Sequence, residues 1–285
     1  MHYTSFLLQV KWDVSPVIFH IGGFSLRYYS LLFGLAFLSS YTILSRVFTR
    51  EKVPLEDLNS LTIYVFLGTL IGARLGQVFF YEFGYYSTHL LEIILPFRID
   101  KVKGFEFTGF QGLASHGGAV GILTAIYFYC RRHQHRFLWV ADRVALVVPL
   151  AGFFIRLGNL FNSEIIGKPF NGAWAFIFYR IDTIPRHPTQ LYEAVCYLLI
   201  FGLLWMVFKR KGKTSSEGLL FGLFLVLVFT VRFALEFLKE NQEAFENRLP
   251  LNMGQILSLP LVLTGLILIC RSCISKSPNK VQSNL

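Results

Sequence analysis

Long apolar stretches recur along the whole chain, and they constrain its fold more than any other feature. An α-helix needs about 20 apolar residues to cross the hydrocarbon core of a bilayer, and about seven stretches approach that length. Alternation with a period of two is not sustained over ten-residue segments, which argues against an outer-membrane barrel. We therefore predict an all-α polytopic membrane protein with about seven transmembrane helices. The predicted spans are Phe19–Leu44, Leu58–Tyr81, Leu113–Cys130, Val140–Leu160, Leu191–Phe208, Leu219–Leu238 and Ile256–Cys270.

The charge pattern predicts how the chain lies in its membrane. The formal net charge is +10, although only 15% of the residues are charged. Basic residues concentrate in the short connections after the first, third, fifth and seventh predicted spans. Because such loops mark the cytoplasmic side, we expect the amino terminus outside and the carboxyl terminus in the cytoplasm. No nucleic-acid-binding motif accompanies the charge, so we expect no nucleic-acid partner. The basic residues concerned are Arg46, Arg50, Lys52, Arg131, Arg132, Arg136, Lys209, Arg210, Lys211, Lys213, Arg271, Lys276 and Lys280.

Residues 1–273 are predicted to form one transmembrane domain, and residues 274–285 a polar cytoplasmic tail. The amino-terminal residues do not have the pattern of a cleavable signal, and we expect the first span to act as its own targeting signal. Two longer connections, Glu82–Gly112 and Asn162–Gln190, combine Pro, Gly and charges with aromatic residues. Aromatic side chains favour the headgroup level of a membrane. The two connections are therefore predicted to form an extracytoplasmic cap of loops.

A polar cluster, Arg156–Gly167, interrupts this apolar pattern at the end of the fourth predicted span. Ionisable groups at membrane depth are costly, and they usually mark a functional site. A snorkelling arginine is the simpler explanation. However, Asn159 and Asn162 lie three residues apart on a helix, and Glu164 follows at once. A guanidinium with amide groups beside it suits a phosphate, which it can bind through two parallel hydrogen bonds.

Three further polar groups occupy other predicted spans. Arg232 and Glu236 are four residues apart, so they face the same side of a helix. They form either an internal ion pair or a second arginine site facing the same chamber as Arg156. His116 lies among glycines that allow a close approach of main chain or of a ligand, although a hydrogen-bonded structural histidine is the alternative. Glu193 follows a helix-start motif at His187 and, inside a span, needs a partner.

Polar groups from several separate spans predict a shared chamber in the outer half of the membrane. Phosphate-binding arginines without a nucleotide loop, beside a candidate base, favour a phospholipid as the ligand. Cys270 and Cys273 form a C-x-x-C pair but lack two further ligands nearby, so we predict no metal site. Two alternatives remain open. One is a transporter of anionic lipids, although no inverted repeat is evident, and the other is a non-catalytic scaffold.

The segment Arg156–Gly167 resembles the signature of bacterial phosphatidylglycerol–prolipoprotein diacylglyceryl transferases. Further similar motifs follow the same order along nearly the whole chain, which makes coincidence improbable. These motifs are Arg27-Tyr28-Tyr29, Gly72-Ala73-Arg74-Leu75-Gly76, Ser115-His116-Gly117-Gly118, His187-Pro188-Thr189-Gln190-Leu191-Tyr192-Glu193, Arg232-Phe233-Ala234-Leu235-Glu236-Phe237 and Met253-Gly254-Gln255-Ile256-Leu257-Ser258-Leu259-Pro260.

The resemblance implies a seven-helix protein of the bacterial inner membrane with its amino end outside. It implies transfer of the diacylglyceryl group of phosphatidylglycerol to the lipobox cysteine thiol of prolipoprotein signal peptides. The products are a thioether-linked lipid and glycerol phosphate, and no metal or organic cofactor takes part.

The resemblance also assigns roles to residues. Arg156 and Arg232 bind the headgroup and stabilise the departing phosphate, and Glu236 orients Arg232. His116 is the candidate base for the cysteine thiol, because the thiolate is the nucleophile; its alternative role is to position lipid. The residues expected to contact the lipid or shape its pocket are Tyr29, Asn159, Glu164 and Gly167.

The chain departs from the family pattern at several positions, none of which removes a charge from the proposed chamber. These departures place local packing and substrate preference in question more than the reaction. They are Ile155, Ser163 and Ser30 in place of glycine, Leu160 in place of phenylalanine, and Lys239-Glu240-Asn241-Gln242 in place of an arginine-x-Pro-Asp-like run.

Overall fold

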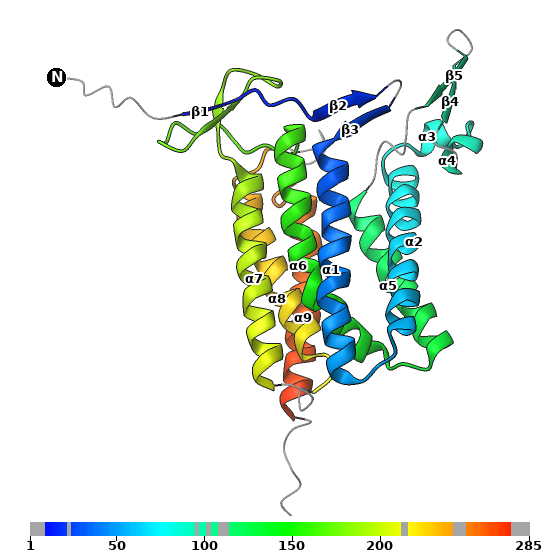
Figure 1. The fold of residues 1–285 in the computed structure, drawn as a ribbon. Coiled ribbons are helices and arrows are strands. Elements are labelled where there is room, and N and C mark those ends of the chain that lie inside the picture. The colour runs from blue at the N-terminus through cyan, green and yellow to red at the C-terminus, as the bar shows by residue number, and fades with distance from the viewer. Residues whose placement is uncertain are drawn as a thin grey trace, which may run out of the picture. The chain divides into compact units, whose positions relative to one another are not determined.

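The computed structural model describes most of the chain as long helices with short strands at their ends (Figure 1). The described residues are 9–21, 24–94, 97–100, 104–107, 114–211, 216–241 and 249–274. Most of the predicted tail 274–285, and Gln242, lie outside them. The chain divides into two compact units. The first unit is Met1–Val47 with Ala141–Leu285, and the second unit is Phe48–Val140.

The helices confirm the prediction of a polytopic helical membrane protein. Among the described residues, six helices are long and apolar enough to cross a membrane: α1, α2, α6, α7, α8 and α9. The third predicted span corresponds to α5, whose polar ends make it less apolar than the others. The bounds are α1 (Tyr28–Glu51), α2 (Leu55–Phe80), α3 (Phe83–Tyr86), α4 (Leu91–Ile94), α5 (Ser115–His133), α6 (Phe137–Asn162), α7 (Thr189–Lys211), α8 (Leu219–Glu236) and α9 (Met253–Ile274).

The connections contain short strands as well as the predicted loops. Outside helices, main-chain groups need other partners, and aromatic or β-branched residues favour strands. In the first unit, β1 pairs in parallel with β6, β6 pairs antiparallel with β7, and the β2–β3 hairpin leads directly into α1. In the second unit, β4 and β5 form an antiparallel pair. The bounds are β1 (Val10–Trp12), β2 (Val17–Ile21), β3 (Phe24–Arg27), β4 (Phe97–Asp100), β5 (Gly104–Phe107), β6 (Phe176–Phe178) and β7 (Pro185–Arg186).

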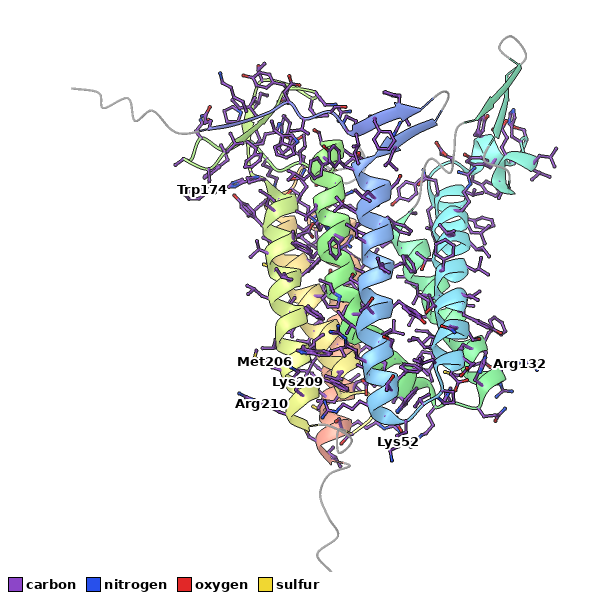
Figure 2. The ribbon with its side chains drawn as sticks, in the orientation of Figure 1. Lys52, Arg132, Trp174, Met206, Lys209 and Arg210 are labelled. Carbon is purple, nitrogen blue, oxygen red and sulfur yellow. The ribbon has the colours of Figure 1, made fainter. Side chains whose placement is uncertain are left out.

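The helices of the first unit pack around a buried apolar cluster, while large apolar side chains such as Leu199 (68% exposed) remain outside. Such an outer surface is expected where the solvent is lipid. In Figure 2, Trp174 lies at one end of α7, while Lys209 and Arg210 lie at the other. We call the Trp174 end, where α6 ends and α7 begins, the sheet end of the first unit. The buried cluster comprises Val47, Leu146, Tyr197, Ile200, Leu204, Phe208 and Leu220.

At the opposite end of the first unit, Asp142 of α6 caps the start of α8. Its carboxylate accepts hydrogen bonds from the main-chain nitrogens of Gly218 and Phe221, both at 2.8 Å. These nitrogens have no partner within a helix, so the carboxylate of a neighbouring helix replaces the usual N-cap side chain. Asp142 is 1% exposed, and these two hydrogen bonds help to compensate its burial.

Glycines bring α2 and α5 of the second unit into direct main-chain contact. A Cβ atom at Gly72 would lie 2.4 Å from the carbonyl oxygen of Gly117, and one at Gly121 would lie 2.0 Å from that of Gly68. The sequence predicts that these glycines admit a close approach of either main chain or a ligand. At Gly117 and Gly121 it is the main chain of α2 that approaches.

Replacing Gly72 with leucine should therefore separate the two helices. We expect a loss of about 1–3 kcal/mol in the free energy of unfolding, the usual effect of overpacking. The thermal unfolding midpoint of the detergent-solubilised protein measures the change. Gly202→Leu in α7 is the matched control, since a Cβ there meets nothing within 4 Å. Equal midpoints for the two variants would contradict the prediction.

Arg74 of α2 contacts main-chain oxygens and an aromatic ring within the second unit. Its Nε donates to the carbonyl oxygen of Ile93 at 3.1 Å, and its guanidinium carbon lies 4.8 Å from the ring centre of Tyr86. A second nitrogen donates to the carbonyl oxygen of Glu92. The arginine thus holds the segment containing α3 and α4 against the end of α2.

Candidate functional site

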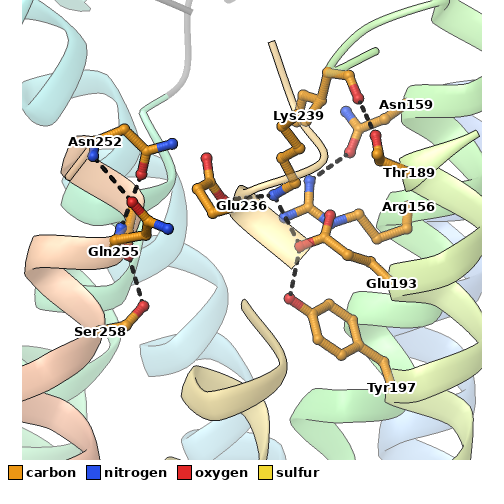
Figure 3. A network of polar contacts seen from close by, with 12 residues as sticks. Arg156, Asn159, Thr189, Glu193, Tyr197, Glu236, Lys239, Asn252, Gln255 and Ser258 are labelled. Atoms are coloured by element: carbon orange, nitrogen blue, oxygen red, sulfur yellow. Dashed lines mark hydrogen bonds and ion pairs between the residues drawn. The ribbon is translucent and has the colours of Figure 1, made fainter. Parts of the chain in front are cut away.

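Four charged side chains, three of them buried, meet near the sheet end of the first unit (Figure 3). They come from α6, α7, α8 and the residues just after α8. We call these residues the charge chain, because positive and negative groups alternate along it. The charge chain consists of Arg156, Glu193, Lys239 and Glu236.

The contacts within the charge chain are short, and two of its side chains are almost completely shielded from solvent. Nε of Arg156 lies 2.8 Å from Oε2 of Glu193, and Nζ of Lys239 lies 3.0 Å from Oε1 of Glu193. Nζ of Lys239 also lies 2.9 Å from Oε2 of Glu236. The side chain of Glu193 is 0% exposed and that of Lys239 is 2% exposed. Two cations and two carboxylates balance, so the charge chain is neutral as a whole.

A short main-chain ladder places Lys239 in the charge chain. The main-chain nitrogen of Lys168 donates to the carbonyl oxygen of Leu238 at 2.8 Å, and that of Glu240 donates to Ile166 at 3.2 Å. Gly167 and Lys239 form the antiparallel bridge between these two bonds. Because successive residues of an extended segment point to opposite sides, the ladder fixes the direction of the Lys239 side chain.

The predicted signature at the end of α6 is joined by hydrogen bonds. A guanidinium nitrogen of Arg156 donates to Oδ1 of Asn159 at 3.1 Å, and Nδ2 of Asn159 donates to Oε2 of Glu164 at 2.9 Å. Nδ2 of Asn162 donates to the other oxygen of Glu164 at 3.1 Å. Arg156, Asn159 and Glu164 therefore form one continuous polar surface, as their spacing predicted.

The main chain is strained where α6 ends. Ser163 and Ile165 both have φ of 56°, a left-handed conformation that side chains rarely adopt. The resemblance indicates glycine at position 163, and this φ is the physical reason for that preference. A β-branched residue such as Ile165 is a stronger outlier, and strain of this kind concentrates at functional sites.

Gly167 and Tyr29 shape the surroundings of the signature. A Cβ atom at Gly167 would lie 2.4 Å from the carbonyl oxygen of His187, so the close approach of the two segments requires glycine. The ring of Tyr29 in α1 lies against Gly158 of α6, where a Cβ would approach it to 2.7 Å. Both positions are closely packed, and their role in shaping a lipid pocket stays a prediction.

Arg232 is the least compensated cation at this site. Within the described residues, no hydrogen bond or ion pair reaches its guanidinium, although its charge acts on Glu193. The predicted pairing with Glu236 is not formed, because Glu236 contacts Lys239 instead. Sequence spacing identified two groups on one helical face, but it could not show a competing ammonium from beyond the helix end.

Lys239 is the residue that sequence analysis missed. It was read as a departure in an outer connection, yet it is fully buried between two carboxylates. The available signal was Glu193, whose position inside a span predicted a partner. That prediction is confirmed twice over, since both Arg156 and Lys239 contact it.

Arg186 of β7 reinforces the same ladder from its outer side. It donates to the carbonyl oxygen of Gly167 at 3.3 Å and to the carboxylates of Asp182 and Glu240. The hydrogen bond from Arg186 holds the pKa of the Asp182 carboxyl below its usual value. Burial against the Phe170 ring lowers the pKa of His187, which favours its neutral form.

His116 is the second residue of α5 and is partly buried in the second unit. Its position beside the charge chain stays a prediction. Across the described residues, no group of three or more His, Cys, Asp or Glu side chains is placed to hold a metal ion.

Comparison with known proteins identifies the family. The model of the prolipoprotein diacylglyceryl transferase family matches residues 16–271. The chain belongs to this family. A phosphatidylglycerol–prolipoprotein diacylglyceryl transferase of Chloroherpeton thalassium is 47% identical over 264 residues, which cover 92% of this chain and 94% of the relative. Proteins of the same name from Tolumonas auensis and Bacteroides fragilis are 45% and 44% identical, covering 93% and 92% of this chain and 98% and 95% of the relatives.

Proposed function

We propose that this protein transfers the diacylglyceryl group of phosphatidylglycerol to the cysteine thiol of prolipoproteins. Membership of the family and the printed names of its relatives support this activity. The structural observation that supports it most is the different state of the two arginines. Arg156 forms an ion pair with Glu193, whereas no carboxylate among the described residues contacts Arg232. A cation without a protein partner is suited to an incoming phosphate.

The reaction replaces a carbon–oxygen bond with a carbon–sulfur bond. The thiolate sulfur attacks the glyceryl carbon that carries the phosphate ester. The new thioether forms as the carbon–oxygen bond breaks, and glycerol phosphate leaves with the electron pair. Arg156 and Arg232 stabilise the charge that grows on the departing phosphate, because fixed cations in a dry site lower such a barrier strongly.

In this proposal five further residues line the headgroup pocket: Tyr29, Asn159, Glu164, Gly167 and Glu236. The protein substrate is a signal peptide with a lipobox cysteine. We further propose that residues 1–273 form the transferase domain in a bacterial inner membrane. The sheet end then faces outward and the basic ends of the spans face the cytoplasm, as the loop charges indicate.

The proposal is tested by incubating membranes that contain the protein with a lipobox peptide and phosphatidylglycerol labelled in its acyl chains. Label attached to the cysteine through a thioether is the expected result. A matching peptide with serine in place of cysteine should remain unlabelled. Labelled lipid that crosses the membrane without covalent product would support a transporter instead.

His116→Gln tests the proposed base. A positioned base contributes about 10²–10⁴-fold, so we expect turnover to fall by at least about a hundredfold at neutral pH. Raising the pH ionises the thiol without a base, and the deficit of the variant should shrink as the pH approaches the thiol pKa. A variant with near-normal turnover at every pH would remove His116 from this role.

A further inference from the structure

The charged side chains around Lys239 nearly cancel one another. Arg156, Glu193, Lys239 and Glu236 sum to zero, and Arg232 adds one positive charge. Lys239 is 2% exposed, so water does not screen its interaction with either carboxylate. Its ammonium therefore determines whether the site is positive or neutral.

Lys239 also determines which partners remain available. It occupies Oε1 of Glu193 and Oε2 of Glu236, at 3.0 and 2.9 Å. Glu236 would otherwise be free to pair with Arg232, which precedes it by four residues on the same helical face. With Lys239 in place, the guanidinium of Arg232 has no such partner among the described residues.

Glu236 and Gln255 offer polar atoms that suit the hydroxyl groups of a neutral headgroup. Its carboxylate lies directly against the start of α9, where a Cβ at Gly254 would approach both oxygens to 2.9 Å. The next residue, Gln255, is 4% exposed, and its amide nitrogen has no hydrogen-bond partner among the described residues. Its amide oxygen is held by the main-chain nitrogen of Asn252 at 3.2 Å. Gln255 thus offers a buried donor one residue beyond Gly254, and Glu236 offers acceptor oxygens. Hydroxyl groups, which both donate and accept, can pair with either.

We propose that Lys239 is a positioning and selectivity residue: it withholds Glu193 and Glu236 from Arg232 and from a cationic lipid headgroup. The inference rests on the proposed function and names the headgroup class that the site selects. A glycerol headgroup is neutral and enters beside Lys239 without repulsion. The ammonium of phosphatidylethanolamine would lie near Lys239 and is repelled there.

Headgroup competition tests the inference directly. Purified protein in detergent micelles is loaded with a fluorescent phosphatidylglycerol, which is displaced by unlabelled phosphatidylglycerol or phosphatidylethanolamine. The selectivity is the ratio of the two displacement constants. We expect Lys239→Met to reduce this selectivity by at least about tenfold, because it removes the buried ammonium that repels the ammonium of phosphatidylethanolamine. Lys239→Arg should retain the wild-type selectivity.

Transfer kinetics give a second readout that a purely structural role would not produce. In Lys239→Met, Arg232 becomes able to pair with Glu236, so the KM for phosphatidylglycerol should rise. In Lys239→Arg the KM should stay at the wild-type value. Arg186→Met is the matched control. It removes contacts to Gly167 and Glu240 but no contact of the Lys239 side chain, so it should lower thermal stability without changing the selectivity.

Glu236→Gln keeps the inference testable if Lys239→Met does not fold. This variant leaves Lys239 paired with Glu193 and raises the local charge by one. It should therefore increase the selectivity against phosphatidylethanolamine, the opposite direction to Lys239→Met. Unchanged selectivity in a folded Lys239→Met, or in Glu236→Gln, would overturn the inference. Wild-type protein that binds both lipids but transfers nothing would instead overturn the proposed function, since displacement does not require transfer.

Discussion

Replacing Arg156 with glutamine is expected to reduce diacylglyceryl transfer by at least about 10²–10³-fold. The loss of one fixed donor to a developing anion has this magnitude in other enzymes. Arg156 offers more than one contact, because its Nε is held by Glu193 while another nitrogen donates to Asn159. The guanidinium is therefore oriented before substrate arrives, which is the condition under which an electrostatic group lowers a barrier most.

The measurement is the initial rate of thioether formation with a lipobox peptide, at equal amounts of inserted protein. Arg180→Gln is the matched control. Arg180 lies near the same end of α6, is exposed, and makes long contacts to the carbonyl oxygens of Phe161 and Asn162, at 3.4 and 3.5 Å. We expect the control to stay within about twofold of wild type, since exposed charges contribute little. An Arg156→Gln rate within tenfold of wild type would contradict the assigned role.

Arg156→Lys separates charge from geometry at the same position. Lysine retains the positive charge but loses the planar fork that contacts Glu193 and Asn159 together. We expect this variant to remain folded and yet to transfer much more slowly than wild type. Recovery of most of the activity would mean that charge alone is sufficient.

The spans and the arginine signature could be predicted from sequence because their signals are local. An apolar run of membrane length requires a helix whatever surrounds it, since main-chain groups have no other partner in lipid. Likewise, Arg156, Asn159 and Glu164 lie within nine residues, so the end of one helix brings them together. Ser163 was marked as a departure, and its positive φ supplies the reason.

The remainder of the site depends on contacts between distant segments. Lys239 reaches the charge chain through a ladder that joins residues about seventy positions apart, and no local pattern indicates such pairing. Glu236 was assigned to Arg232 because helical spacing allowed it, whereas a nearer ammonium decided the outcome. The glycines beside His116 predict a close approach of either main chain or a ligand. A glycine pattern alone does not show which of the two it is, and at Gly117 and Gly121 it is the main chain of α2.

Removing the central carboxylate should have the largest effect on stability. Glu193→Leu leaves Arg156 without its carboxylate partner and Lys239 with Glu236 alone. Breaking a buried ion pair from one side destabilises proteins by about 3–5 kcal/mol, and here Glu193 contacts two cations rather than one. We expect a free energy of unfolding at least about 3 kcal/mol below wild type, measured by titration of the micellar protein with a denaturing detergent.

A second substitution distinguishes loss of charge balance from loss of packing. Adding Lys239→Met to Glu193→Leu removes one of the two cations that Glu193 contacted and releases Glu236 from Lys239. The two neutral side chains can then pack against each other. If electrostatics dominate, the double variant is more stable than Glu193→Leu alone by at least about 1 kcal/mol, a coupling expected only between contacting residues. If packing dominates, the second substitution lowers stability further. The sign of this coupling therefore shows whether the charge chain, rather than the space it fills, holds the ends of α6, α7 and α8 together.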